Sequence, residues 1–244
     1  MSFQQRRHHS SGLSRDFLQV SGLTIVSATL TACASAPAAP PPPTAEAPVA
    51  NADEALQRLL EGNQRYAAAK STNLNESESR RIEVAKGQKP FATVFGCVDS
   101  RVPPELVFDR GLGDLFVIRT AGQVIDKAVL GSLKFGFAEL HIPLLVVLGH
   151  EKCGAVKATI EAVESNSQAE AEINWLVDGI RPSVEKVKGQ SGDLLDNAVK
   201  ANVAAVVSQL KSSSILAEAV EKGELKIVGA RYDLDTGVVE ITVP

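Results

Sequence analysis

The chain has 244 residues, of which 44% are hydrophobic and only 5% aromatic, so it can bury a full core built mainly from aliphatic side chains. Its formal net charge is −4, and it has no basic block and no patch that combines basic with aromatic residues. These properties argue against nucleic acid as a partner. Three cysteines in a chain of this length also exclude a small protein held together by disulfides.

The first fifty residues lack the pattern of a folded domain. Three arginines within the first fifteen residues precede a modestly apolar run at 17–32, which is too short and too polar to span a bilayer permanently. This layout predicts an export signal at 1–33. Residues 34–50 are rich in Ala and Pro, which favours a semi-rigid, extended tether between that signal and the rest of the chain.

Two short motifs in this segment resemble bacterial export motifs. Leu30-Thr-Ala-Cys33 resembles the lipobox of bacterial lipoproteins, in which the cysteine is lipidated and becomes the new amino terminus. Ser14-Arg-Asp-Phe-Leu18 resembles the twin-arginine motif but lacks one of the paired arginines, so the export route stays open. The resemblance implies a bacterial protein exported to the periplasm or cell envelope, with a lipid on Cys33 as its membrane anchor. The alternative is a disordered tail with an unrelated cysteine.

Hydrophobic periodicity divides residues 51–244 into alternating helices and strands. Helices are expected at 51–69, 76–87, 126–140, 154–164, 169–188 and 193–222, the last interrupted near 212–214. Strands are expected at 91–96, 115–119, 142–148, 225–232 and 238–243. The alternation predicts one α/β domain over 51–244, with a central, mostly parallel sheet flanked by helices, an antiparallel edge strand and an N-terminal helical arm.

Reactive side chains follow directly after two of the predicted buried strands. After the first come Cys97, Asp99 and Arg101, and after the second come His150 and Cys153. Ligands of α/β sheets bind beyond the carboxyl ends of the strands, so these side chains are expected to meet there. Zinc prefers tetrahedral nitrogen and sulfur ligands, and two thiolates with one imidazole match that preference. The pattern therefore predicts a Zn²⁺ site.

The fourth position on such an ion decides whether the site can react. If Asp99 fills it, the site is closed and inert. If Asp99 pairs with Arg101 instead, water can bind the ion and lose a proton near neutral pH. Either half of the motif alone is more often structural, because a buried cysteine behind a strand is usually a small hydrophobe. Both halves at matched topological positions favour the metal site.

The pattern as a whole resembles that of the β-class carbonic anhydrases. The matching stretches are 87–91, 97–103, Arg119-x-Ala121, 149–154 and 229–234. The resemblance covers the chain from about residue 53 to its carboxyl terminus. It implies the reversible hydration of carbon dioxide to bicarbonate and a proton, with one Zn²⁺ per subunit held by Cys97, His150 and Cys153.

The resemblance also assigns roles to the residues around the metal. It implies that Asp99 either caps the ion or pairs with Arg101, which makes these two the catalytic pair. Gln88 and the backbone at Gly154 are implied to lie near bound substrate, with Gln88 often acting across a subunit boundary. Members of the family form dimers or multiples of dimers, so a homodimer is expected here, with helix 51–69 packing on the neighbouring subunit.

Two other functions stay open at this point. Hydrolysis of carbon disulfide or carbonyl sulfide could use the same zinc site, and nothing in the sequence separates it from carbon dioxide hydration. The other alternative is a non-catalytic zinc-binding protein at the cell surface. Asp99, Arg101 and Gln88 argue against this alternative, because a purely structural site needs none of them.

Overall fold

The computed structural model describes residues 46–244, so the export signal, the lipobox and the first part of the tether lie outside the described residues. The helices are α1 (Ala52–Ala67), α2 (Glu78–Val84), α3 (Pro104–Val107), α4 (Lys127–Ala138), α5 (Gly154–Glu164), α6 (Ala171–Val187), α7 (Leu194–Lys211) and α8 (Ser214–Glu221). The strands are β1 (Ala92–Gly96), β2 (Leu115–Arg119), β3 (Leu144–His150), β4 (Lys226–Tyr232) and β5 (Val239–Val243). A 3-10 turn, η1 (Ala121–Gln123), follows β2.

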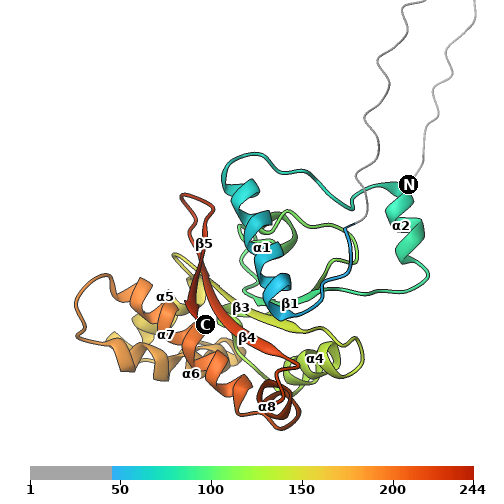
Figure 1. The fold of residues 1–244 in the computed structure, drawn as a ribbon. Coiled ribbons are helices and arrows are strands. Elements are labelled where there is room, and N and C mark those ends of the chain that lie inside the picture. Colours follow the sequence, from blue (N-terminus) through green and yellow to red (C-terminus); the bar gives the residue numbers. More distant parts are fainter. Residues whose placement is uncertain (1–45) are drawn as a thin grey trace, which may run out of the picture. The chain divides into compact units, whose positions relative to one another are not determined.

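The five strands form one sheet in the order β2-β1-β3-β4-β5 (Figure 1). The pairs β1–β2, β1–β3 and β3–β4 are parallel, and β4–β5 is antiparallel. The predicted fold class, a mostly parallel sheet with an antiparallel edge strand and flanking helices, is therefore confirmed. The predicted helices and strands all form, whereas α3 and η1 were not expected, because four and three residues are too few to show a period.

Helices cover both faces of the sheet, and successive apolar residues of the central strand β3 point to opposite faces. On β3, Val146 and Leu148 pack in the cluster that contains α1, whereas Leu145 and Val147 pack in the cluster that contains α7 and α8. All seven residues of β3 are buried. A strand that is buried on both faces explains why this segment reads as a continuous apolar run.

Helix α1 packs on the sheet of its own chain, and its expected contact with a neighbouring subunit stays a prediction. It begins with a capping box, in which Asn51 Oδ1 accepts from the Glu54 amide at 2.9 Å and Glu54 Oε2 accepts from the Ala50 amide at 2.7 Å. Leu59 has no exposed surface and lies in the same apolar cluster as β1, β3 and β4. Asn63, also buried, donates to backbone carbonyls of 107 and 237. These contacts satisfy the buried face of α1 within one chain.

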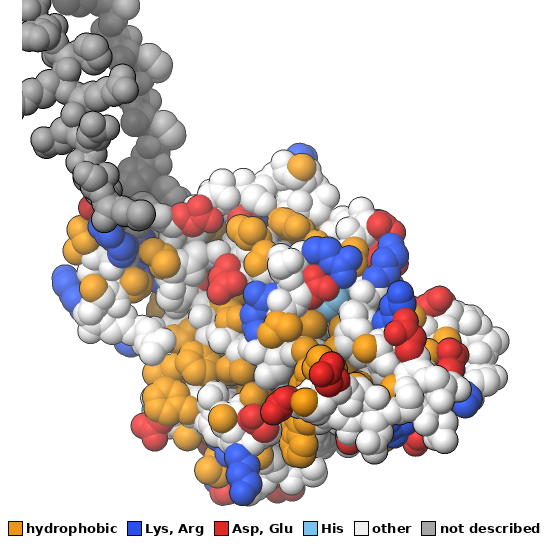
Figure 2. Space-filling model, turned by 180° about the vertical axis from the view of Figure 1, so that it is seen from behind, with side chains coloured by type: hydrophobic (Ala, Val, Ile, Leu, Met, Phe, Trp, Pro, Cys, Tyr) orange, Lys and Arg blue, Asp and Glu red, His pale blue; other side chains and the backbone are white. Residues whose placement is uncertain are grey.

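The face drawn in Figure 2 has no dominant charge. On the face drawn in Figure 2, Lys and Arg side chains are interspersed with Asp and Glu, and a group of hydrophobic side chains gathers on one side. Within 46–244, no single helix is long and apolar enough to cross a membrane; α7 and α8 pass such a test only together, as a pair bent by 88°. Buried apolar side chains of α7 and α8 pack in the cluster with Leu145 and Val147 of β3, and those near the start of α7 pack in a second cluster with α5 and α6.

Candidate metal centre

The turn after β1 carries the first two site residues, and Arg119 holds it in place. From the end of the neighbouring strand β2, Arg119 Nε donates to the carbonyl oxygen of Cys97 and Nη2 to that of Asp99, both at 2.6 Å. Two hydrogen bonds from one planar guanidinium fix the positions of both peptide groups. Sequence reasoning noted Arg119 only as part of a matching stretch and assigned it no role, because the pairing of β1 with β2 is needed to bring it to the turn.

His150 is the last residue of β3 and has no exposed surface. Its Nδ1 lies 2.8 Å from the carbonyl oxygen of Glu151, which can only accept, so Nδ1 carries a proton and Nε2 is the nitrogen available to a metal ion. Nε2 is buried and has no hydrogen-bond partner. A buried imidazole nitrogen without a partner costs free energy, and a metal ion would satisfy it.

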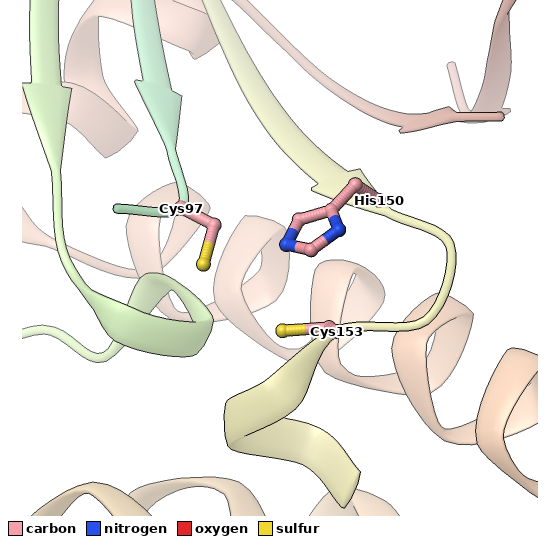
Figure 3. Close-up of side chains that lie close together, drawn as sticks. All are labelled: Cys97, His150 and Cys153. Atoms are coloured by element: carbon pink, nitrogen blue, oxygen red, sulfur yellow. The ribbon is translucent and has the colours of Figure 1, made fainter. Parts of the chain in front are cut away.

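Cys153 is placed two residues beyond Glu151, at the N-cap of α5. The turn that reaches it passes through Lys152, whose φ of 52° lies in the left-handed region. The sulfur atoms of Cys97 and Cys153 and a ring nitrogen of His150 lie within 4.8 Å of one another. Figure 3 shows the three side chains pointing toward a common point from three different elements. Two thiols and one imidazole, all buried, fit the donor set that zinc prefers.

The thiols differ strongly in acidity because they lie next to each other. The hydrogen bond from Cys153, assisted by His150 and the Gly122 amide, lowers the pKa of Cys97 to about 4 despite its burial. The same contact and burial raise the pKa of Cys153 above its ordinary value. Burial alone would lower the pKa of His150, but the adjacent Cys97 thiolate raises it. The metal-free site therefore holds one thiolate and retains protons that a bound cation would displace.

Asp99 is paired with Arg101 and is not grouped with the three donors. Arg101 Nε and Nη2 donate to the two carboxylate oxygens at 2.9 and 2.7 Å, and the Arg101 amide donates at 3.0 Å. These contacts lower the pKa of Asp99 to about 2. Asp99 Oδ2 remains 3.8 Å from His150 Nε2. The carboxylate thus lies beside the donor cluster and is held there by Arg101.

The two predicted substrate-binding residues have different positions. Gly154 is the first residue of α5, directly after Cys153, so its backbone lies beside the donor cluster, and its contact with substrate stays a prediction. Gln88 is exposed and precedes β1, whereas Cys97 follows that strand. Five residues of strand span about 16 Å, so the two ends of β1 lie far apart. Gln88 therefore does not reach the metal centre of its own chain.

The geometry defines this molecule as an α/β protein with a Cys₂His cluster that could hold a metal ion, at the carboxyl edge of a mostly parallel sheet. The sequence profile of a family described as carbonic anhydrase matches residues 92–239. The chain is 41% identical to carbonic anhydrase 2 of Mycobacterium tuberculosis over 191 residues, which cover 78% of this chain and 92% of that protein.

Solved structures agree with this comparison. A Coccomyxa β-carbonic anhydrase, solved in complex with acetazolamide, is 29% identical with a TM-score of 0.60 over 76% of this chain and 85% of that chain. A tetrameric β-carbonic anhydrase from Sordaria macrospora shares the fold, with 20% identity and a TM-score of 0.62 over 76% of this chain and 95% of that chain. The chain belongs to the β-class carbonic anhydrase family.

Proposed function

We propose that this protein catalyses the reversible hydration of carbon dioxide to bicarbonate and a proton with Zn²⁺ bound by Cys97, His150 and Cys153. The observation that carries the proposal is the buried Cys₂His cluster with an unpartnered His150 Nε2, next to a carboxylate held by arginine. When bound, zinc supplies a Lewis-acidic cation that makes water a nucleophile near neutral pH. A purely structural site would have no use for the Asp99–Arg101 pair.

The residues around the cluster have separate tasks in this proposal. Asp99 stays ionised, since its pKa is about 2, and so offers a fixed acceptor that orients the reacting water. Arg101 keeps the carboxylate turned away from the fourth position and also donates to the Lys152 carbonyl at 3.3 Å, which links the two ligand-bearing turns. Burial of all three ligands strengthens every charge interaction at the site.

Removal of one ligand tests the proposal. Cys153→Ala leaves one thiolate and one imidazole, so zinc content and carbon dioxide hydration should both fall to background. Metal analysis and a stopped-flow pH-indicator assay measure the two quantities. Cys33→Ser is the matched control, because it removes the only cysteine outside the cluster and should retain both. Full activity in Cys153→Ala would refute the proposal.

A second activity, hydrolysis of carbon disulfide or carbonyl sulfide, would use the same residues. The same enzyme preparation, assayed side by side with dissolved carbon dioxide, carbonyl sulfide and carbon disulfide at matched concentrations, separates the two functions. The proposal expects carbon dioxide to be the preferred substrate by the ratio of kcat/KM. A preference for either sulfur compound would reassign the reaction while leaving the metal site unchanged.

We also propose a homodimer, or a multiple of it, in which Gln88 serves the metal centre of the partner. Gln88 lies at the far end of β1 from its own site, so only a second copy can bring it near substrate. A free edge supports the interface: β2 has one strand neighbour in the described sheet, and Phe116 on it stacks on Phe135, which is 49% exposed.

Complementation distinguishes a partner's Gln88 from a chain's own. A heterodimer of Gln88→Ala with Cys153→Ala has one intact metal centre, and in the proposed arrangement that centre faces the wild-type Gln88 of the other chain. Purified with two different tags, the heterodimer should recover about half of the wild-type activity per dimer, because one of its two sites is complete. Recovery no greater than that of Gln88→Ala alone would show that Gln88 does not act across the interface.

Export and lipid anchoring are further parts of the proposal, together with the division into a signal at 1–33, a tether and a catalytic domain. Their support is the sequence pattern alone: the apolar run, the lipobox ending at Cys33 and the Ala/Pro-rich stretch after it. Mass spectrometry of the amino-terminal peptide and fractionation of expressing bacterial cells test them. A diacylated Cys33 in the membrane fraction, lost in Cys33→Ser, is expected; an unprocessed Met1 in the cytoplasm would contradict it.

A further inference from the structure

We propose that Asn202, in the middle of α7, is a positioning residue for the metal centre that acts through Gly122 on the sulfur of Cys97. This inference rests on the proposed zinc site and deepens it. Asn202 lies 49 positions beyond Cys153, the last ligand in the chain, and it touches none of the three ligands. Its effect would pass through one hydrogen-bonded glycine.

Asn202 is an unusual residue for its place. It is 3% exposed and lies between apolar neighbours on the buried face of α7. Burial of an amide is unfavourable unless its polar atoms are paired, and asparagine is a poor helix former. Here Nδ2 donates to the Gly122 carbonyl at 2.7 Å, and Oδ1 accepts from Ser183 Oγ at 3.4 Å. The buried amide is therefore explained by its bond to the turn η1.

Gly122 is held tightly in that turn. Its φ of 63° and ψ of 22° lie in the left-handed region, and a Cβ added to it would come within 2.5 Å of Ile180 Cδ1 and 3.2 Å of Ala155 Cβ. From this position the Gly122 amide donates to Cys97 Sγ at 3.5 Å. Asn202 holds the carbonyl side of the same residue, so the two hydrogen bonds together fix its orientation.

The N–H···S bond matters because Cys97 is proposed as a zinc ligand. A donor to a thiolate withdraws electron density from sulfur and fixes the direction of its lone pairs, so groups outside the ligand shell tune the metal. Without Asn202 the Gly122 carbonyl would lose its buried partner, and the turn would gain by rotating that carbonyl toward water. Such a rotation would weaken the bond to sulfur.

Other hydrogen bonds also hold the turn η1, so replacing Asn202 should not unfold it. Gln123 Nε2 donates to the Leu148 carbonyl at 3.1 Å, and Thr120 Oγ1 donates to the Val124 carbonyl at 2.9 Å. Because these contacts remain when Asn202 is replaced, the loss of its amide should reorient Gly122 without unfolding the turn. Asn202→Leu keeps the branched shape of the side chain and its number of heavy atoms, and it removes the donor.

The experiment uses the full-length protein with Co²⁺ in place of zinc. Two quantities are measured: the thiolate-to-cobalt charge-transfer absorption, and the rate at which a chelator removes the metal. For Asn202→Leu we expect a shifted charge-transfer band and metal loss about 10- to 100-fold faster than in the wild type, the range typical for groups that support a metal ligand. Neither readout depends on turnover.

Two control variants separate positioning from general destabilisation. Asn63 is an equally buried amide, 3% exposed, but it bonds the backbone of α3 and of the β4–β5 turn instead of the metal centre. Asn63→Leu should lower the free energy of unfolding and leave the cobalt spectrum unchanged. Ser183→Ala removes the other partner of Asn202 and leaves its bond to Gly122, so its spectrum and rate of metal loss should stay close to wild type.

The outcomes are distinguishable. An Asn202→Leu protein with the wild-type band and the wild-type rate of metal loss overturns the inference while the proposed function stands. If Asn202→Leu does not fold, Asn202→Ala takes its place, and failure of both to fold while Asn63→Leu folds would assign Asn202 a structural role only. A wild-type protein without any thiolate-to-cobalt band would instead refute the proposed metal site itself.

Discussion

At the scale of single residues, the structure shows contacts that hold the Asp99 carboxylate on Arg101, beside the three candidate metal ligands. Asp99 lies 3.8 Å from His150 Nε2, close enough to compete for the ion, and Arg101 holds it by three hydrogen bonds. The main chain of the same turn is held from the other side by Arg119. Arg119 therefore fixes the main chain of the turn that carries Cys97, whereas Arg101 fixes the side chain of Asp99.

Arg101→Leu should free the Asp99 carboxylate to approach the fourth metal position. We expect zinc content to be unchanged and kcat to fall by about 10- to 100-fold, as when a group supporting a metal site is removed. The pKa of Asp99 should rise from about 2 toward its ordinary value. Since both values lie well below neutral pH, the loss would persist across the neutral and alkaline range instead of appearing only in acid. Stopped-flow rates against pH measure this.

Arg81→Leu is the matched control for this prediction. Arg81 also pairs with a carboxylate, Glu78 at 3.0 Å, but both side chains lie on the exposed surface of α2. An exposed pair contributes little, so the rate and its pH dependence should match the wild type. Equal losses in the two variants would show that Arg101 has no special role.

At the scale of elements, hydrogen bonds to a buried carboxylate, Asp109, join the end of α1 and the loop after it to the segment after α3. Asp109, whose side chain is 1% exposed, accepts from Arg65 at the end of α1 at 2.6 Å and from Thr72 Oγ1 at 2.8 Å. Burial alone would raise the pKa of Asp109, but the Arg65 and Thr72 hydrogen bonds hold it below its ordinary value. This carboxylate fixes the loop after α1 to the segment after α3.

The stabilisation from Asp109 should depend on pH with a defined sign. The pKa of Asp109 is lower in the folded than in the unfolded protein, so the contribution is complete above the unfolded value of about 4 and is lost as pH falls through the folded value. Asp109→Asn lacks this titration. Urea unfolding of the metal-free wild type and of metal-free Asp109→Asn measures the free energy of unfolding of each. The wild type should be the more stable of the two, and this difference should become smaller as the pH falls below about 4. A difference that is constant with pH would contradict the prediction.

At the scale of the whole molecule, the folded domain begins earlier than its hydrophobic pattern indicates. Glu46, placed by sequence in the tether, forms salt bridges with Arg58 and Arg110, and the Arg110 side chain is only 1% exposed. Arg110 also donates to the Arg58 carbonyl at 2.6 Å and lies over the Phe91 ring. The last residues of the tether are therefore part of the domain, because they carry the charge that neutralises a buried guanidinium.

A protein that starts at residue 51 should be less stable than one that starts at residue 44. The shorter protein leaves the buried Arg110 without its carboxylate, and we expect a loss of about 1–3 kcal/mol in the free energy of unfolding. Chemical denaturation of the two zinc-loaded proteins measures the difference. Glu46→Gln in the longer protein should reproduce part of the loss, and equal stability of all three would place the domain boundary at residue 51.

Much of this architecture could be read from local patterns. The apolar runs at β1 and β3 and the two-residue alternation of β5 indicate strands, and the capping box at Asn51 marks the start of α1. Helix boundaries differ from the predicted ones by a few residues, because end residues are held by capping contacts and not by the hydrophobic period. The short helix α3 begins at Pro104, and proline is favoured at the first position of a helix. Its four residues are too few to show a hydrophobic period.

The sequence by itself determined the α/β class and the three candidate metal ligands, because strand periodicity is a local property and each half of the cysteine–histidine motif directly follows a predicted strand. Only the tertiary structure decided that Asp99 turns toward Arg101, that Arg119 reaches the turn with Cys97, and that Asn202 reaches Gly122. The physical reason is that a hydrogen bond between distant segments leaves no periodic trace. It exists only once strand pairing and helix packing have brought its donor and acceptor together.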